Sequence, residues 1–282
     1  MSKPTTIHYL DYRDPLETLE FVRGVFHTNF PDKSPDFLTT LFQKVTDLFT
    51  GHYPGYQACD TKFHDIGHTC QATVATVRIL DGQIKTSHAP RLAARDFELA
   101  VAAILLHDAG YIKETGDNSG TGAKYTLIHV ERSADFAAKF LPPLGVTEDE
   151  VRVVRLAIQC TGVQVDTSRL AFRDEGERFI GCALGTGDML GQMAAANYPE
   201  QLPALFREFE EAGMTAYRDA TDLMRQTRGF YIAHVRELLE DEWGKVYRVL
   251  PYHFGNGRNL YIEAIEHNLD RIDRLVNQAA PA

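Results

Sequence analysis

The sequence predicts an all-α protein, and three observations support that prediction. Apolar residues recur at intervals of three and four along most of the chain, as they do on one face of a helix. No segment shows sustained alternation of apolar and polar residues between hairpin turns. Caps, prolines and glycines divide the chain into segments of helical length. We therefore expect a single all-α domain over residues 1–282, with a core at about 60–195 and flanking helices at 15–50 and 200–278.

The N-terminal helices are predicted by spacing and by start signals. A first helix begins at Pro15 and carries its apolar residues at Leu16, Leu19, Val22 and Phe26. A second begins after Ser34, the expected N-cap, with proline in the first helical position, and ends at Gly51. The aromatic, turn-rich residues 51–56 are expected to form a loop. A long helix then runs from Asp60 or Thr61 to about Ile79, followed by a turn at Asp81-Gly82.

The remaining segments follow the same logic. A helix starting at Pro90 should end at His107-Asp108, and the glycine-rich residues 113–124 should form a flexible loop. Thr147 and Glu150 have the spacing of a capping box at the start of a later helix. The other expected helices are Tyr125–Phe140, Phe179–Met193, and two or three amphipathic helices over Leu202 to about Tyr247 and Leu260–Val276.

Composition and charge narrow the classes of function. Apolar residues make up 44% and charged residues 24% of the chain, the balance of an ordinary globular protein. No apolar run approaches the roughly 20 residues of a membrane-spanning helix, and the first residues lack the apolar stretch of a signal peptide. We expect a cytoplasmic protein that does not bind membranes. The net charge of −10 argues against binding a nucleic-acid polymer. The four cysteines are expected to be reduced.

One stretch combines an apolar helix with two groups that are costly to bury. Residues 99–106 are eight consecutive apolar residues, and His107 and Asp108 follow at once. A buried carboxylate or imidazolium is expensive unless it is paired or bound to a metal. A metal ion would satisfy both groups, so the question becomes which other residues complete such a site.

Two further segments supply candidate ligands. His64 and His68 are four residues apart and would project from the same face if both lie on a helix. Asp188 lies among glycines that share its helical face, at Gly181 and Gly185. Glycine costs a helix about 1 kcal/mol relative to alanine, so something should approach the backbone there. Tight helix packing explains the glycines equally well, but it does not explain the acid between them.

His68, His107-Asp108 and Asp188 resemble the H…HD…D signature of the HD-domain superfamily of metal-dependent phosphohydrolases, over roughly Thr61–Met193. The resemblance implies that these four side chains bind a divalent metal inside a helical bundle. The segment 63–68, Phe-His-Asp-Ile-Gly-His, is also similar to the Tyr-His-Asn-x-x-His segment of cyclic nucleotide phosphodiesterases. That similarity implies that His64 is a proton donor and His68 a ligand.

The chemistry is consistent with this family. Two imidazoles and two carboxylates suit one or two divalent ions such as Zn, Mn, Fe, Ni or Mg. Such an ion activates water and polarises a phosphoryl oxygen. Asp108 would orient the attacking water or bridge to a second ion, and His64 would protonate the leaving oxygen. We expect a metal-dependent phosphohydrolase acting on a small phosphate ester, a phosphodiester or a nucleotide, with His64 and Asp108 as the catalytic residues.

Some positions depart from the motifs of these families, and the role of others is left open by the sequence. Asp65 stands where the phosphodiesterases have asparagine, and the adjacent His-His pair of HD-GYP proteins is missing. His129 either reaches the site or is a surface or core histidine. Lys113 either meets a substrate phosphate or is a solvated surface charge. Gln192, one turn beyond Asp188, is a further candidate for contact with substrate.

Three other functions compete with the general phosphohydrolase. Activity on cyclic nucleotides is suggested by the 63–68 segment alone. A helical metal-containing sensor or binding module without turnover would keep the same ligands. A zinc peptidase is the third, because His64-Asp65-Ile66-Gly67-His68 differs from H-E-x-x-H only by Asp for Glu. The peptidase hypothesis gives His107, Asp108 and Asp188 no role.

Overall fold

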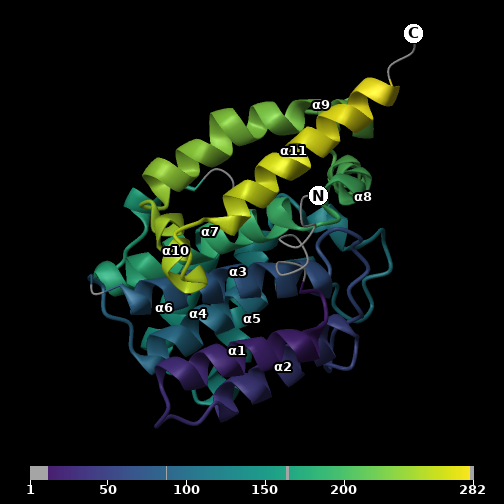
Figure 1. The fold of residues 1–282 in the computed structure, drawn as a ribbon. Coiled ribbons are helices and arrows are strands. Elements are labelled where there is room, and N and C mark those ends of the chain that lie inside the picture. The colour runs from purple at the N-terminus through teal and green to yellow at the C-terminus, as the bar shows by residue number, and fades with distance from the viewer. Residues whose placement is uncertain (1–11, 87, 163–164, 280–282) are drawn as a thin grey trace.

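A computed structural model describes residues 12–86, 88–162 and 165–279, and these residues confirm the all-α class (Figure 1). Within them the only β-type pairing is an isolated bridge between Tyr56 and Glu114. The α-helices are α1 (Pro15–Asn29), α2 (Asp36–Phe49), α3 (Ile66–Lys85), α4 (Ala94–Leu106), α5 (His129–Phe140), α6 (Glu148–Gln159), α7 (Glu175–Ala194), α8 (Tyr198–Glu211), α9 (Ala220–Phe230), α10 (Leu250–Phe254) and α11 (Leu260–Ala279).

Helices α3, α4 and α7 form the centre of the fold. Helix α3 packs against both α4 and α7, and it is also covered by α1 and α10. Figure 1 shows α1 and α2 on one side of this centre and the antiparallel pair α9 and α11 on the other. The central helices therefore carry side chains that are shielded from water on nearly every side.

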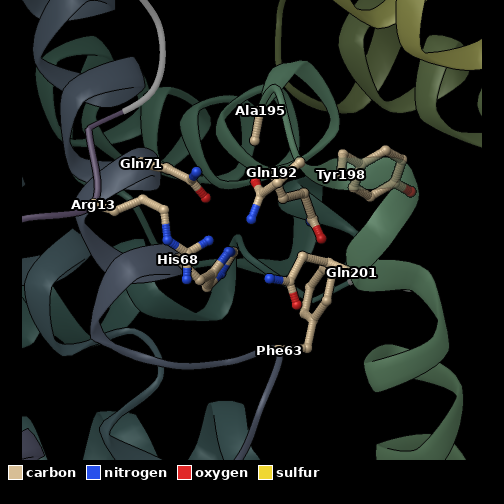
Figure 2. Close-up of a pocket in the computed structure, with 9 residues that line it drawn as sticks. Arg13, Phe63, His68, Gln71, Gln192, Ala195, Tyr198 and Gln201 are labelled. Atoms are coloured by element: carbon tan, nitrogen blue, oxygen red, sulfur yellow. The ribbon is translucent and has the colours of Figure 1, made fainter. Parts of the chain in front are cut away.

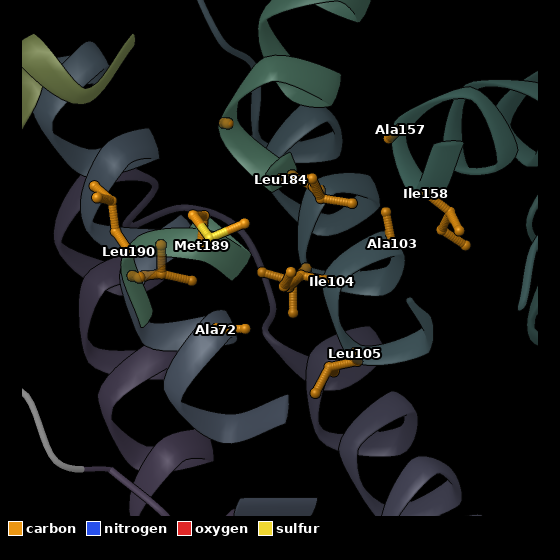
Figure 3. Packing of buried hydrophobic residues seen from close by; sticks show 14 of the residues in the cluster. Ala72, Ala103, Ile104, Leu105, Ala157, Ile158, Leu184, Met189 and Leu190 are labelled. Carbon is orange, nitrogen blue, oxygen red and sulfur yellow. The ribbon is translucent and has the colours of Figure 1, made fainter. Parts of the chain in front are cut away.

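The apolar run at the end of α4 is buried as the sequence predicts. Residues 99–106 are all at most 4% exposed. Figure 3 shows Ile104 of α4 among side chains from its two neighbours, including Ala72 of α3 and Leu184 and Met189 of α7. Burying a side chain of this size contributes about 1.5–3 kcal/mol. This packing fixes the end of α4, where His107 and Asp108 follow.

The glycines of α7 allow very close helix contacts. A Cβ atom on Gly187 would lie 2.0 Å from Oγ1 of Thr76 on α3, and one on Gly191 would lie 2.9 Å from the backbone of Ala72. Gly185 makes a similar approach to Trp243 and to the carbonyl of Cys160. Gly181, the other glycine predicted on the face of Asp188, would place a Cβ 2.8 Å from Sγ of Cys160, so tight packing explains Gly181 and Gly185. Gly187 and Gly191, which lie on another face of α7, bring this helix and its acid close to α3.

Several predicted boundaries were wrong. Helix α3 starts at Ile66 with Asp65 as its N-cap, so His64 precedes the helix and does not share a helical face with His68. The turn expected at Asp81-Gly82 is a continuous part of α3. Gly82 does not end the helix, because glycine is needed there for close packing. A Cβ on Gly82 would lie 2.4 Å from the carbonyl oxygen of Val249.

Smaller corrections concern the N-terminal helices. Leu16 is 71% exposed and does not join the core with Val22 and Phe26. The N-cap of α2 is Pro35, although the hydroxyl of Ser34 still accepts a hydrogen bond from the backbone N–H of Asp36.

Two predictions from composition agree with the structure. None of the described helices is long and apolar enough to cross a membrane. Cys59, Cys70, Cys160 and Cys182 are free thiols, as expected.

Candidate metal centre

Four buried side chains from three parts of the fold converge on one point. Nε2 of His68, near the start of α3, lies 3.2 Å from both Asp108 Oδ2 and Asp188 Oδ1. Nε2 of His107, the C-cap of α4, lies 3.2 Å from Asp108 Oδ2 and 3.4 Å from Asp188 Oδ1. His68, His107 and Asp188 each offer a ligand atom, and these atoms lie within 4.8 Å of one another. The four predicted ligands are therefore brought together.

The geometry and charge of this cluster fit a divalent ion. His107 Nε2, Asp108 Oδ2 and Asp188 Oδ1 are buried and have no hydrogen-bond partner among the described residues. Ligand atoms bound about 2.1 Å from one ion, at angles of about 90–110°, would lie about 3.0–3.4 Å apart. The four distances between a histidine Nε2 and a carboxylate oxygen fall in this range. Two carboxylates and two neutral imidazoles also balance the charge of one divalent cation.

The two carboxylates of the cluster strongly shift the pKa values of the histidines that face them. Burial alone would lower the pKa of His68, but the facing carboxylates of Asp108 and Asp188 outweigh burial and raise it to about 10. The pKa of His107 is raised for the same reason, again against the effect of burial. Burial would raise the pKa of each carboxyl, yet the imidazoles hold both well below their ordinary range. The site therefore strongly favours positive charge between the acids.

The histidines around the site are oriented by contacts of their outer ring nitrogens. Nδ1 of His107 lies 2.7 Å from the carbonyl oxygen of Ile104, and Nδ1 of His129 lies 2.6 Å from that of Thr126. With Nδ1 engaged, Nε2 of each ring is left to face the cluster. A hydrogen bond at the ring nitrogen that faces away from a metal sets the tautomer and direction of a metal-binding histidine.

His64 reaches the site from the loop before α3. Its Nδ1 lies 2.6 Å from Oε2 of Glu208, and its ring stacks on Tyr111 with 4.5 Å between ring centroids. The His64 and His68 rings are 5.4 Å apart between centroids and nearly perpendicular. The predicted proton donor is thus beside a predicted ligand, although they do not share a helix.

His129 also lies beside the cluster. Its Nε2 lies 3.8 Å from Oδ1 of Asp108, the oxygen that does not face His68 and His107. Its ring stacks on Tyr111, and burial lowers its pKa. A Cβ on Gly110 would lie 2.1 Å from the carbonyl of His129, so the start of α5 can approach only because residue 110 is glycine.

The two remaining candidates for substrate contact, Gln192 and Lys113, differ in their position relative to the cluster. Gln192 lines a small pocket that shares His68 with the cluster (Figure 2). Lys113 is buried, but its ammonium donates to the carbonyl of Gly120 at 2.8 Å and pairs with Asp60 at 2.8 Å. It holds the loop against the preceding segment and does not line the cluster. Lys113 is therefore not a solvated surface charge, and its ammonium is already engaged by Asp60 and Gly120.

Glu208 is a site residue that sequence reasoning missed. Its Oε1 accepts hydrogen bonds from the backbone N–H groups of Lys62 and Phe63, while Oε2 faces His64. Burial would raise its pKa, but the contact with His64 and the two N–H groups hold the pKa below its ordinary value. A signal exists, because Glu208 continues the apolar spacing of Leu202 and Leu205 on one face of α8. An acid on an apolar face needs a partner.

Comparisons with known proteins add little about chemistry. No curated protein matches the chain. A family model described as Npun_R2479-like matches residues 116–247, a span that contains His129, Asp188 and Glu208 but neither His68 nor His107-Asp108. The chain is thus similar, over that span, to a family whose description names no activity.

Proposed function

We propose that this protein is a metal-dependent phosphohydrolase of the HD type, which hydrolyses a phosphate ester or phosphodiester of a small molecule or nucleotide. The observation that carries the proposal is the convergence of His68, His107, Asp108 and Asp188, with three of their buried ligand atoms left without hydrogen-bond partners in the described chain. The resemblance of these four positions to the H…HD…D signature supports the same choice.

The mixed ligand set suits a borderline or hard divalent ion, such as Zn, Mn, Fe, Ni or Mg. Bound by these four residues, the ion would supply Lewis acidity that activates water and neutralises charge on the phosphoryl group. The protein's part is to hold the ligands rigidly. The buried end of α4 and the close contact between α3 and α7 serve that purpose.

His64 is the proposed proton donor to the leaving oxygen. Its Nδ1 is held by the carboxylate of Glu208 at 2.6 Å, which leaves Nε2 as the atom that can deliver a proton. Glu208 acts as a positioning residue, because it also holds the backbone on which His64 lies. A histidine oriented by a carboxylate is well suited to general acid catalysis near neutral pH.

Asp108 connects the ligands to the rest of the site. One of its oxygens faces His68 and His107, and the other lies 3.8 Å from Nε2 of His129. The second oxygen is available to accept a proton from, or to orient, the attacking water. We propose that His129 keeps this carboxylate in place and contributes to binding the phosphate.

The geometry disfavours a zinc peptidase. In an H-E-x-x-H site both histidines project from one helix toward the metal. Here His64 lies before the N-cap of α3, and its Nδ1 contacts Glu208. A sensor without turnover would keep the ligands but has no need of the His64–Glu208 pair.

The test is a metal-supplemented activity screen of the purified chain. The substrates are phosphate monoesters, cyclic nucleotides and nucleoside mono- and triphosphates, each with Mn²⁺, Zn²⁺, Ni²⁺ or Mg²⁺, and elemental analysis measures the metal retained. We expect about one ion per chain, or two, and hydrolysis that a chelator abolishes. Retained metal without turnover on any substrate would favour the sensor instead.

A further inference from the structure

A small pocket beside the metal cluster shares His68 with it. Gln71 follows His68 by one turn on α3, and Gln192 follows Asp188 by one turn on α7. Figure 2 shows Gln192 and Gln201, from α7 and α8, extending into the same space beside His68. A group bound in this pocket would lie next to a group held at the metal centre.

Carboxamides dominate the lining of the pocket. Asn197 joins the three glutamines, and its Oδ1 is buried without a hydrogen-bond partner in the described part of the chain. Carboxamides offer hydrogen-bond donors and acceptors without net charge. Phe63 and Tyr198 add apolar surface. The lining therefore suits a ligand that is polar but uncharged.

The charge around the pocket points the same way. Arg13 is the only permanently charged side chain among the described residues that line it. The guanidinium of Arg13 donates to Oδ2 of Asp65 at 2.9 Å, so its charge is already balanced. Binding a phosphate usually takes unbalanced arginine or lysine side chains that form charge-assisted hydrogen bonds. This pocket offers none in its described lining.

The size of the pocket also favours a small uncharged group over a phosphate. Its volume is about 10 Å³, which is room for about one water molecule. A hydroxyl or a carbonyl oxygen fits a space of this size, whereas a phosphate would have to displace the glutamine side chains.

We propose that the pocket beside His68 is a subsite for one polar group on the non-reacting part of the substrate, and that Gln192 and Gln201 there select a hydroxyl or carbonyl group over a second phosphate. The inference rests on the proposed phosphohydrolase function, because it assumes that the reacting phosphate is held at the metal centre. Its substrates are therefore monophosphates of polyols or of other uncharged polar compounds, not bisphosphates.

Three phosphonates, which cannot be hydrolysed, separate binding from turnover. They are butylphosphonate, 3,4-dihydroxybutylphosphonate and butane-1,4-diphosphonate, and calorimetry measures their binding to the Mn²⁺-loaded chain. We expect the dihydroxy compound to bind about 10-fold more tightly than butylphosphonate, and the diphosphonate to gain nothing. Gln192→Leu and Gln201→Leu should each remove most of the gain and leave butylphosphonate binding unchanged within about 2-fold. Gln43→Leu on the exposed face of α2 is the matched control.

The outcomes separate this inference from the function on which it rests. If butylphosphonate binds but the hydroxyl groups add nothing, or if the diphosphonate binds most tightly, the subsite assignment is wrong while the phosphohydrolase proposal stands. Equal losses for all three compounds in the glutamine variants would indicate a structural role and also overturn the assignment. If none of the three binds to the wild-type protein, both proposals fail.

Discussion

Helix α3 carries two buried polar clusters, and they satisfy their polar groups in opposite ways. Near its start, His68 faces two carboxylates whose inner oxygens have no hydrogen-bond partner in the described chain. Near its end, Asp81 accepts a hydrogen bond from Asn29 at 2.8 Å and pairs with Lys85 at 2.7 Å and His253 at 2.5 Å.

Arg78, one turn before Asp81 on α3, is a buried cation that also has partners. The guanidinium carbon of Arg78 lies 5.2–5.7 Å from the centroids of four aromatic rings, and the group donates to the hydroxyl of Tyr261. Favourable cation–π contacts compensate part of its desolvation. The comparison teaches that burial of charge alone does not distinguish the two clusters. The difference is that the first brings together ligand atoms that have no hydrogen-bond partner in the described chain.

The largest expected difference between the clusters is in their response to metal. Adding Mn²⁺ to chelator-treated protein should stabilise the wild type by about 3 kcal/mol at a hundredfold excess over Kd, because the ion binds only the folded state. Asp188→Asn should abolish that stabilisation and lower phosphatase activity on the order of 1,000-fold or more. Thermal melts and elemental analysis measure the effect. Asp81→Asn is the matched control and should retain the ion; an Asp188→Asn protein with a full metal content would contradict the assignment.

The next effect isolates proton donation from metal binding. His64→Ala should retain the metal and lower kcat about 100-fold, because the leaving oxygen loses its proton donor. Glu208→Gln should lower kcat about 10-fold with KM unchanged, because it removes only the group that orients His64. Steady-state kinetics with elemental analysis separates these effects. Wild-type turnover by His64→Ala would refute its role.

The stability provided by the Asp81 cluster should depend on pH, whereas that of the His68 cluster should depend on metal. Burial would raise the pKa of Asp81, but hydrogen bonds from His253, Asn29 and Lys85 hold it below its ordinary value of 3.8. Asp81→Asn should therefore cost about 2–3 kcal/mol of unfolding free energy at pH 7.

The sign of this pH dependence follows from the lowered pKa. The stabilisation by Asp81 is complete above about pH 3.8 and is lost as the pH falls through the lower pKa of the folded state. Urea denaturation of wild type and variant at several pH values gives the difference. A difference that stays constant down to pH 3 would show that the carboxylate charge contributes nothing.

The smallest effect tests the close contact that joins the metal ligands. Gly187→Ala should destabilise the protein by about 1–3 kcal/mol, because its Cβ would lie 2.0 Å from Oγ1 of Thr76. It should also weaken metal binding by moving Asp188. Gly24→Ala is the matched control in α1, where a Cβ meets nothing within 4 Å, and should stabilise the fold by about 0.5–1 kcal/mol. Equal stability of the two variants would show that the contact is not tight.

Local patterns predicted much of the fold and part of the site. The capping box at Thr147 and the buried residues 99–106 were predicted correctly, because both depend on neighbouring residues. The start of α3 was not predicted, since Asp65 caps the helix and the loop before it is held by Glu208, more than 140 residues away. The approach of His129 to Asp108 depends on the contact between Gly110 and the start of α5.

The sequence by itself determined the helical class and which residues could bind a metal, because periodicity, caps and an acid beside apolar residues are local properties of the chain. Only the tertiary structure decided that His68, His107, Asp108 and Asp188 meet, that Glu208 orients His64 and that Lys113 is engaged elsewhere. Those outcomes depend on how closely α3, α4, α7 and α8 pack, and that distance is set by side chains far apart along the chain.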